Sequence, residues 1–392
     1  MTNVPDDERL HALDCLRGLA LCAMILVHFH QRMRQDVTGV EDLIGWGVWV
    51  LLEQKAWGTF AFLFGAGFGI LLRRLDARAQ SVWPIFLRRM AALALFGVIA
   101  EVGFGFGILT EYACWGVALL VIRRWSTPTL LVAAAVFASA RPLVAELTAL
   151  HILGLSKGAA APAHIAVVQA AAAAASQDQY VTLLSARWAL FVHSLALGWR
   201  DLLPTVNLAL FTLGLLAVRH RVLDEPGRHV RLIAGWMIFG LVSWATSWLV
   251  LRNLPATGIP GADWPIAYGF GLIQDQWLCF TYIGAVVLLM HARPAWSGRL
   301  AWFGAAGRMA LTNYMFQAIV LDALASGYGA ALTVRPYLYP VATALLFTVE
   351  ALASRAWLAR CHLGPLEWLW RTITYARVAP LRRAAAADVV PA

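Results

Sequence analysis

Long apolar runs recur along the whole of this 392-residue chain, and they constrain its fold more than any other feature. Hydrophobic residues make up 60% of the sequence and charged residues only 14%, with a mean hydropathy of +0.67. A soluble domain carries far more charge on its surface. Because about 20 apolar residues cross a bilayer as a helix, the sequence predicts an all-α, polytopic transmembrane helix bundle surrounded by lipid.

Hydropathy predicts about ten spans, and a shorter apolar segment at residues 42–52 is expected to lie at the membrane interface or to re-enter the bilayer. The first span follows a polar start and lacks the small-residue cleavage site of a secretory signal, so it is expected to be retained. The predicted spans centre on residues 13–30, 56–72, 87–104, 108–122, 128–147, 202–218, 232–251, 266–290, 301–324 and 338–358.

Arginines gather in the connections that follow the second, fourth, sixth, eighth and tenth predicted spans. Because arginine-rich connections stay in the cytoplasm, both termini are predicted to be cytoplasmic. The whole chain, 1–392, is then one integral membrane domain, with an Ala-rich extracytoplasmic loop at 148–200 and a cytoplasmic segment at 359–392. The arginines that set this topology are Arg73, Arg74, Arg78, Arg88, Arg89, Arg123, Arg124, Arg219, Arg221, Arg228, Arg231, Arg293, Arg299, Arg360, Arg371, Arg377, Arg382 and Arg383.

The first span carries ionisable residues along one side. Asp14 and Arg17 are three residues apart and are expected to pair on one helix face. At about 100° per residue, His28 lies near the same side, whereas His30 points about 160° away from His28. The two histidines are therefore not expected to share a metal ion. Because ionisable side chains are costly in a membrane, this stripe predicts a functional site.

Nucleic-acid binding and metal binding find no support in the sequence. The net charge of +9 comes from arginines dispersed between apolar runs, without the long basic tract or aromatic stripe that nucleic-acid binding needs. The five cysteines show no CxxC or Cys/His spacing. Neither a disulfide framework nor a metal site is therefore expected.

Two acids, Glu101 and Glu111, flank the glycine-rich stretch Gly103–Gly107. Non-helical backbone at membrane depth is tolerated only where protein or a water-filled cavity satisfies its polar groups. The two acids therefore indicate either such a cavity or a pair of interfacial carboxylates wetted by solvent.

Further polar residues lie inside the later spans. Asp275 is expected to face the bundle interior. Arg308, Asn313 and Gln317 are spaced to fall along one side of a single helix, where amides by default join helices through hydrogen bonds. The glycines of residues 63–69 favour close helix packing over ligand contact.

Four motifs resemble those of the YeiB family of bacterial inner-membrane proteins and occur in the same order. The resemblance covers nearly the whole chain and implies a multi-pass protein of the bacterial cytoplasmic membrane, in a family whose biochemistry is largely unassigned. The motifs are Asp14-Cys-Leu-Arg17-Gly18, Phe62-Leu-Phe-Gly65-Ala-Gly67, Gly307-Arg308-Met-Ala-Leu-Thr-Asn313-Tyr314 and Gly364-Pro365-Leu-Glu367-Trp368-Leu-Trp370-Arg371. The polar core is expected to include Asp14, Asp275, Asn313, Glu367, Trp370 and Arg371.

The first span also resembles that of the transmembrane acyltransferases, including acyltransferase family three and the lysosomal heparan-glucosamine acetyltransferases. YeiB-type proteins usually have Asn where this chain has His28, fourteen residues after Asp14, and family three has its functional histidine there. YeiB relatives also carry a His and an Asp around the outer turn between the third and fourth spans. At the matching positions this chain has Ile99 or Ala100, and Gly107. The resemblance implies a site rebuilt around His28 and Glu101, which follows Ala100 in the sequence, or an activity that was lost or changed.

These residues favour a membrane acyltransferase that moves a small acyl group, acetyl above all, from acyl-CoA to a hydroxyl or amine of a glycan or small molecule. Histidine suits the role of base or of acyl carrier, so His28 is expected to be catalytic, with Glu101 or His30 as its orienting partner. Arg17 and Arg308 are expected to bind the phosphates of the donor, because the guanidinium fork matches their geometry.

Two other interpretations stay open. A transporter or lipid-linked flippase would use the intramembrane groups Asp14, Arg17, Glu101 and Asp275 as a path for protons or substrate. A non-catalytic membrane sensor or scaffold would show neither turnover nor substrate flux. The acceptor is not specified by the sequence, and a homodimer is left open as the oligomeric state.

Overall fold

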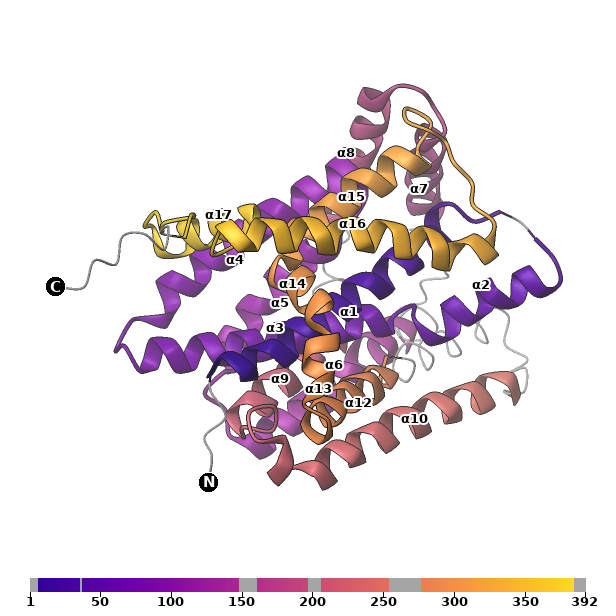
Figure 1. Ribbon diagram of the computed structural model, residues 1–392. Coiled ribbons are helices and arrows are strands. Elements are labelled where there is room, and N and C mark those ends of the chain that lie inside the picture. Colours follow the sequence, from indigo (N-terminus) through magenta and orange to yellow (C-terminus); the bar gives the residue numbers. More distant parts are fainter. Residues whose placement is uncertain (1–5, 36, 148–160, 197–205, 254–275, 384–392) are drawn as a thin grey trace.

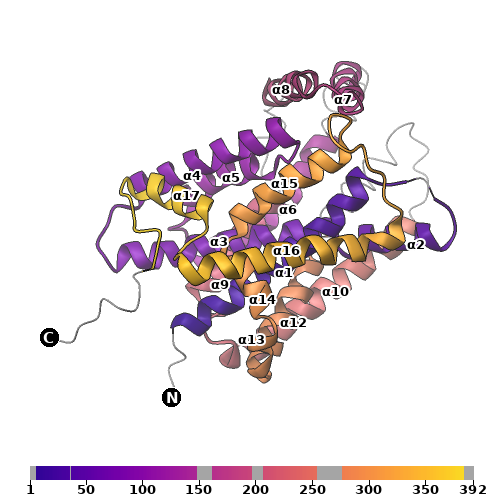
Figure 2. The ribbon, with the colours of Figure 1, turned by 45° about the horizontal axis from the view of Figure 1, so that its top comes forward.

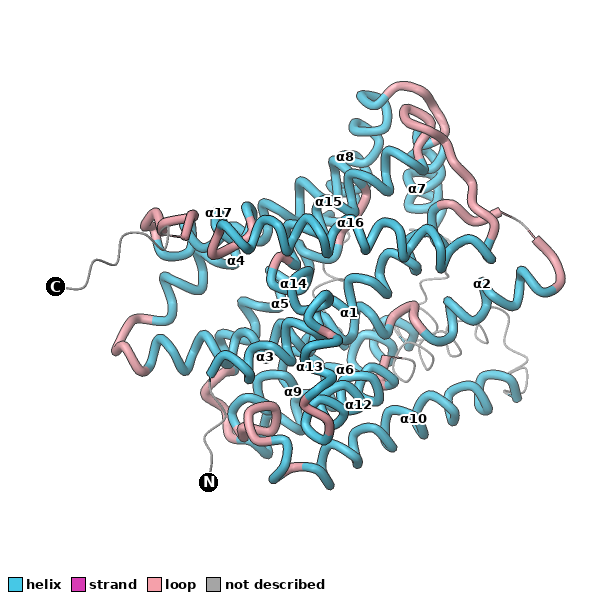
Figure 3. The backbone as a smooth tube through the Cα atoms, viewed as in Figure 1, coloured by secondary structure: helices cyan, strands magenta, loops and turns pink. Residues whose placement is uncertain are grey.

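The computed structural model describes residues 6–35, 37–147, 161–196, 206–253 and 276–383, which form helices joined by loops (Figure 1, Figure 3). Within these ranges there is no β-sheet, and the strand-like pairs are two isolated bridges, Arg34 with Val334 and Cys361 with Arg382. The predicted all-α class is confirmed for the described residues.

A helix stands at each position where hydropathy predicts a span, and two more, α7 and α8, lie within the predicted 148–200 loop. The helices are α1 (Asp6–Arg32), α2 (Val40–Leu51), α3 (Lys55–Asp76), α4 (Val82–Val98), α5 (Ile108–Ile122), α6 (Thr127–Leu147), α7 (Ala161–Ala175), α8 (Tyr180–Ala196), α9 (Val206–Arg219), α10 (Val230–Asn253), α12 (Leu278–Ala292), α13 (Ala295–Arg299), α14 (Ala301–Arg308), α15 (Ala310–Ala325), α16 (Tyr339–Arg360) and α17 (Pro365–Tyr375). Short π- and 3₁₀-helices are η1 (Ile99–Gly103), η3 (Pro226–Arg228) and η4 (Pro336–Leu338).

Three segments of the described chain are long and apolar enough to cross a membrane, namely His11–Arg32, Leu43–Asp76 and Pro336–Arg360. Several shorter apolar helices of 10–17 residues accompany them. This is the pattern of a helical membrane protein. The number of spans and the side on which each terminus lies stay predictions from the sequence.

Helix α2 occupies the segment predicted to lie at the membrane interface or to re-enter. It turns Leu43, Trp46 and Trp49 outward, with 62%, 47% and 48% of their surface exposed. Its 12 residues are too few to span a bilayer, and α3 begins after a break at Gln54. An apolar face with tryptophans on a short helix fits the interfacial interpretation.

Helix α1 lies in the middle of the bundle in both Figure 1 and Figure 2, packed against α3, α14 and α16. Leu13 and Leu16 join an apolar core with residues of α3, α5 and α9. Further along, Leu21 and Ile25 join a second apolar core with residues of α15 and α16. Two apolar cores therefore fix the polar residues of α1 in position.

Arginine-bearing connections that are far apart in the sequence contact one another. The contacts join Arg73 to Asp224, Arg219 to the carbonyl of Arg123, and the Nε1 of Trp370 to the carbonyl of Arg89. The first two contacts join the ends of α3, α5 and α9, and the third joins the carboxy-terminal helix α17 to α4, against which it packs (Figure 2). This clustering at one end of the bundle is what the positive-inside interpretation requires.

The predicted ninth span is two helices rather than one, because the backbone leaves the helical conformation at Met309 (φ −111°, ψ 34°). The break exposes the first amides of α15, and the carboxylate of Glu367 accepts from two of them, Leu311 N at 2.7 Å and Thr312 N at 3.0 Å. An anion at a helix amino terminus satisfies free N–H groups and the helix dipole. Arg308 therefore ends α14, and it does not share a helix face with Asn313.

Glycines allow α3 and α9 to pack backbone to backbone, as the sequence favoured for residues 63–69. A Cβ at Gly65 would overlap the carbonyl of Phe211, and a Cβ at Gly214 would overlap the carbonyl of Phe62. The contact is reciprocal, so each glycine opens space for the other helix. Such small residues let membrane helices approach closely.

Replacing Gly65 or Gly214 with alanine is expected to destabilise the protein by about 1–3 kcal/mol, the cost typical of overpacking a filled interior. Gly235 in α10 is the matched control, because a Cβ there meets nothing within 4 Å. Gly235→Ala should leave stability unchanged or raise it slightly through helix propensity. Thermal unfolding of the purified variants in detergent measures both effects, and equal stability of all three variants would contradict the backbone contact.

Candidate functional site

The connection between α4 and α5 departs from helical geometry beside the end of α1. The last turn of α4 widens into the π-helix Ile99–Gly103, and α5 begins at Ile108. Gly105 adopts φ +75°, a conformation that favours glycine, and a Cβ there would overlap the guanidinium of Arg32. Single turns of π-helix are frequent at functional sites.

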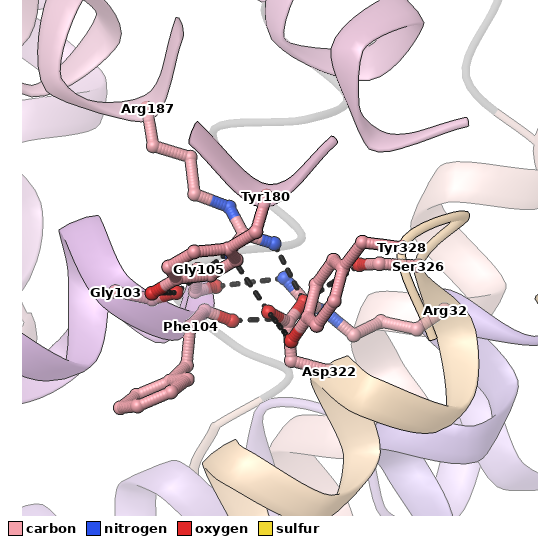
Figure 4. Close-up of polar contacts among 9 residues, drawn as sticks. All are labelled: Arg32, Gly103, Phe104, Gly105, Tyr180, Arg187, Asp322, Ser326 and Tyr328. Atoms are coloured by element: carbon pink, nitrogen blue, oxygen red, sulfur yellow. Dashed lines mark hydrogen bonds and ion pairs between the residues drawn. The ribbon is translucent and has the colours of Figure 1, made fainter. Parts of the chain in front are cut away.

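Four consecutive carbonyls of this turn each accept a hydrogen bond from a side chain of another helix, and Figure 4 shows the bonds to Gly103, Phe104 and Gly105. The donors come from α1, α8 and α15. The bonds are Tyr180 Oη and Arg187 Nη1 to Gly103 O, Arg32 Nη1 to Phe104 O, Arg32 Nη2 to Gly105 O, and Tyr314 Oη to Phe106 O. The predicted requirement that protein or water satisfy this backbone is met here by protein side chains.

A fully buried carboxylate holds the two guanidiniums at the turn. Asp322 Oδ1 accepts from Arg32 at 2.9 Å and from Arg187 at 2.5 Å, while its Oδ2 accepts from Arg187 at 2.8 Å (Figure 4). The hydroxyls of Ser326 and Tyr328 donate to the same carboxylate. Asp322 is thus compensated by two cations and two hydroxyls, the arrangement that makes a buried ion tolerable.

His28 lies against this turn. Its ring meets Phe106 edge to face, with centroids 4.6 Å apart, and the Arg32 guanidinium covers the same phenyl ring at 4.4 Å. Only 6% of His28 is exposed, and its Nε2 has no hydrogen-bond partner among the described residues. The structure therefore places a buried imidazole nitrogen, with no hydrogen-bond partner in the described part of the chain, at the glycine-rich turn.

Glu101 lies on the π-helix of the same turn. A Cβ at Gly107 would stand 2.9 Å from its Cδ, so the carboxyl packs directly beneath that glycine. The carboxylate accepts its hydrogen bond from Thr110 Oγ1 at 3.1 Å rather than from His28. His28 and Glu101 thus contact two parts of one turn without a direct bond between them. Glu111 instead accepts from Trp115 on the same helix and from Asn207, and the second bond joins α5 to α9.

His30 lies apart from His28, on the side of α1 that faces α2 and α16. Its ring is 6.1 Å from that of Tyr339, and a Cβ at Gly45 would meet it at 3.2 Å. This agrees with the divergence expected from helical geometry. The structure therefore does not bring His30 to His28 as an orienting partner.

A second polar cluster lies near the amino-terminal end of α1. Asp14 accepts from Arg17 at 2.7 Å, so the predicted pair is confirmed. Arg308 lies within electrostatic range of Asp14, and Arg89 within range of Arg17. Arg17 and Arg308 thus lie near the Asp14 carboxylate, and Arg89 adds a third positive charge beside Arg17, which leaves a cationic surplus. The sequence predicted Arg17 and Arg308 together, but gave no reason to add Arg89.

The remaining polar residues of the motifs connect helices. Asn313 donates to Ala306 O and Ser354 Oγ, both at 3.0 Å, and so bridges the break between α14 and α15 to α16. Trp370 lies under the Arg89 guanidinium at 3.6 Å, whereas Arg371 is exposed above Tyr375. Asp275 lies outside the described residues. Among the described residues, no three His, Cys, Asp or Glu side chains are grouped to hold a metal ion.

The Asp322 network was not predicted from the sequence. Asp322 is the only acid of its apolar segment, 301–324, and the rule that singled out Asp275 applies to it equally. Arg32 lies just beyond the predicted first span and Arg187 lies in the predicted loop, so neither stood inside a hydrophobic run. Their partnership depends on the tertiary fold, which brings together residues 290 and 135 positions apart from Asp322.

Asp322→Asn is expected to destabilise the protein by about 3–5 kcal/mol, because it leaves two guanidiniums partly buried without their anion. Asp224→Asn is the matched control, since its partner Arg73 is 44% exposed and such pairs contribute about 1 kcal/mol or less. Thermal unfolding in detergent compares the two variants. Equal losses would show that the Asp322 network does not hold the turn.

Comparisons with known proteins divide the chain into two regions. Residues 9–184 match the family described as "Heparan-alpha-glucosaminide N-acetyltransferase, catalytic". Residues 217–377 match the family described as "Protein of unknown function (DUF418)". His28 and Glu101 fall in the first region, and Asn313, Asp322 and Glu367 in the second.

Two uncharacterized relatives align over nearly their whole length. YxaH of Bacillus subtilis (strain 168) is 29% identical over 406 residues, covering 96% of this chain and 97% of the relative. The 39.9 kDa protein in the amylase 3' region of Bacillus acidopullulyticus is 27% identical over 390 residues, covering 96% of each. No solved structure matches the chain.

The resemblance first indicated by the four motifs is confirmed by these matches. Residues 217–377 are similar to the YeiB-like family of unknown function, and residues 9–184 are similar to the catalytic region of heparan-alpha-glucosaminide N-acetyltransferase.

Proposed function

We propose that the protein is a membrane-embedded acyltransferase of the bacterial cytoplasmic membrane, which moves an acetyl or similar small acyl group from acyl-CoA to a hydroxyl or amine. One observation carries this proposal. His28 presents a buried Nε2 without a hydrogen-bond partner among the described residues, at the turn of the half that is similar to an N-acetyltransferase catalytic region. A neutral imidazole nitrogen accepts a proton, which suits a general base.

In the proposed reaction, His28 takes the proton of the acceptor hydroxyl or amine. The acceptor oxygen or nitrogen attacks the thioester carbonyl, the C–S bond breaks, and the CoA thiolate takes up the proton that the imidazolium returns. Alternatively, the imidazole itself carries the acyl group before the acceptor receives it. Donors at the turn, such as the guanidinium of Arg32, are suited to stabilise the negative charge that develops on the carbonyl oxygen.

The cationic cluster of Arg17, Arg89 and Arg308 supports a donor site at the other end of α1. Guanidinium groups bind phosphate oxygens through paired hydrogen bonds. From Arg17 to His28 is eleven residues of one helix, or about 16 Å at 1.5 Å per residue. The long pantetheine arm of acyl-CoA matches such a separation between phosphate site and reacting carbon. A glycan or small-molecule acceptor would then meet the thioester at the turn.

His28→Gln is expected to lower acyl transfer by about 10²–10⁴-fold, the range for loss of a general base. His30→Gln, two residues away and directed toward α2, is expected to change the rate by no more than a few-fold, because its ring contacts Tyr339 rather than the turn. The assay follows incorporation of label from acetyl-CoA by membranes with and without the protein. Full transfer by the His28 variant would exclude the proposed role.

Arg308→Gln is expected to raise the KM for acyl-CoA about tenfold with kcat little changed, because a charge-assisted hydrogen bond contributes about 1.5–3 kcal/mol to binding. Arg308 is exposed and makes one long contact, 3.5 Å to His362 O, so the change spares the fold. Arg299→Gln is the matched control, since this arginine lies over the ring of Trp296. Equal KM values in the two variants would show that Arg308 does not bind the donor.

Flux of substrate into vesicles without acyl-CoA would instead favour a transporter.

A further inference from the structure

Helix α16 carries a buried carboxylate that the acyl-transfer proposal does not use. Glu350 lies in the middle of the apolar segment Pro336–Arg360 and is only 1% exposed. Its Oε2 accepts a hydrogen bond of 2.9 Å from the amide of Gln317 on α15. Its Oε1 has no partner among the described residues. Among the described residues, the carboxyl group of Glu350 therefore receives its hydrogen bond from one neutral amide, that of Gln317.

The surroundings of Glu350 contain no compensating cation within the described part of the chain. From α1, the thiol of Cys22 interacts electrostatically with Glu350, and from α15 the amide of Gln317 donates to it. The one charged residue of α14 is Arg308, which contacts His362 O. On α16 itself, Arg355 lies over the ring of Trp302. A buried charge without a partner is costly, so Glu350 is stable here when it carries a proton.

Asp322 shows how this chain supports another buried carboxylate. That acid is 0% exposed and receives two guanidiniums and two hydroxyls. Glu350 is equally buried and receives one amide. The two acids therefore differ in electrostatic support and not in burial.

A stripe of polar atoms leads from Glu350 to one end of α16. Tyr339, Thr343 and Glu350 are four and seven residues apart, which places them on one helix face. Tyr339 is 0% and Thr343 4% exposed, and the hydroxyl of each has no hydrogen-bond partner among the described residues. The same holds for Oε1 of Gln317 beside Glu350. Buried polar atoms in native proteins are paired with protein or with ordered water.

From this geometry we propose that Glu350 is a proton-binding site, and that a line of internal water along Tyr339 and Thr343 connects it to the end of the bundle near His30. The bound species are a proton and water. The site is separate from His28, which faces the turn on another side of α1. It therefore does not depend on the acyl-transfer proposal, and either proposal can fail while the other stands.

Dicyclohexylcarbodiimide tests the protonation of Glu350, because it modifies protonated carboxyl groups in apolar surroundings. The carboxyl proton moves to a carbodiimide nitrogen, the carboxyl oxygen adds to the central carbon, and rearrangement leaves a stable N-acylurea. Peptide mass spectrometry of the full-length membrane protein should find the adduct on Glu350 and not on Asp322. Glu350→Gln, which keeps the acceptor for Gln317, should lose the adduct. Equal labelling of both acids would overturn the proposal.

Infrared spectroscopy gives a second test that does not require reagent access. The spectrum of the wild type minus that of Glu350→Gln should contain the carbonyl band of a neutral carboxylic acid. Transfer to D₂O should shift this band. The combined change Tyr339→Phe and Thr343→Val should slow that shift about tenfold, which corresponds to about 1.4 kcal/mol on the barrier for exchange. Absence of the band would refute proton binding, and an unchanged exchange rate would refute the water path.

Discussion

The non-helical backbone between α4 and α5 is the constraint on which the rest of the structure depends. Carbonyls that leave a helix inside a membrane protein have no water to bind unless a cavity provides it, so protein groups must donate to them. Arg32 and Arg187 supply most of these donors, and Asp322 neutralises them. The turn thereby ties together α1, α8 and α15, which are distant in sequence.

The same network positions the candidate catalytic residue. Arg32 covers one phenyl ring, Phe106, whose edge contact fixes His28, and Tyr314 bonds the carbonyl of Phe106. Packing thus holds the imidazole of His28 in its orientation. Its Nε2 has no hydrogen-bond partner among the described residues. This differs from the arrangement expected from the sequence, in which Glu101 or His30 would orient His28 directly. Packing on the turn replaces that orienting hydrogen bond.

The sequence predicted what depends on local pattern and missed what depends on tertiary partners. Apolar runs located the helices, spacing paired Asp14 with Arg17, and glycine spacing indicated that residues 63–69 pack closely against another helix, because each of these is a property of one segment. The break at Met309 was not predicted, since it depends on Glu367 from α17 as the acceptor for the amides of α15. Asp322 was missed for the same reason: its guanidinium partners come from other segments.

Asp322 and Glu350 share one sequence feature, a lone carboxylate in an apolar run, but the structure indicates a different role for each. A lone carboxylate in an apolar run indicates function by default, yet Asp322 is fully explained by its structural partners. Glu350 has the same signal and lacks those partners within the described chain. Two guanidiniums bind the Asp322 carboxylate, whereas the carboxyl group of Glu350 receives one neutral amide from the described residues. The distinction rests on the electrostatic partners of each acid, which only the folded structure reveals.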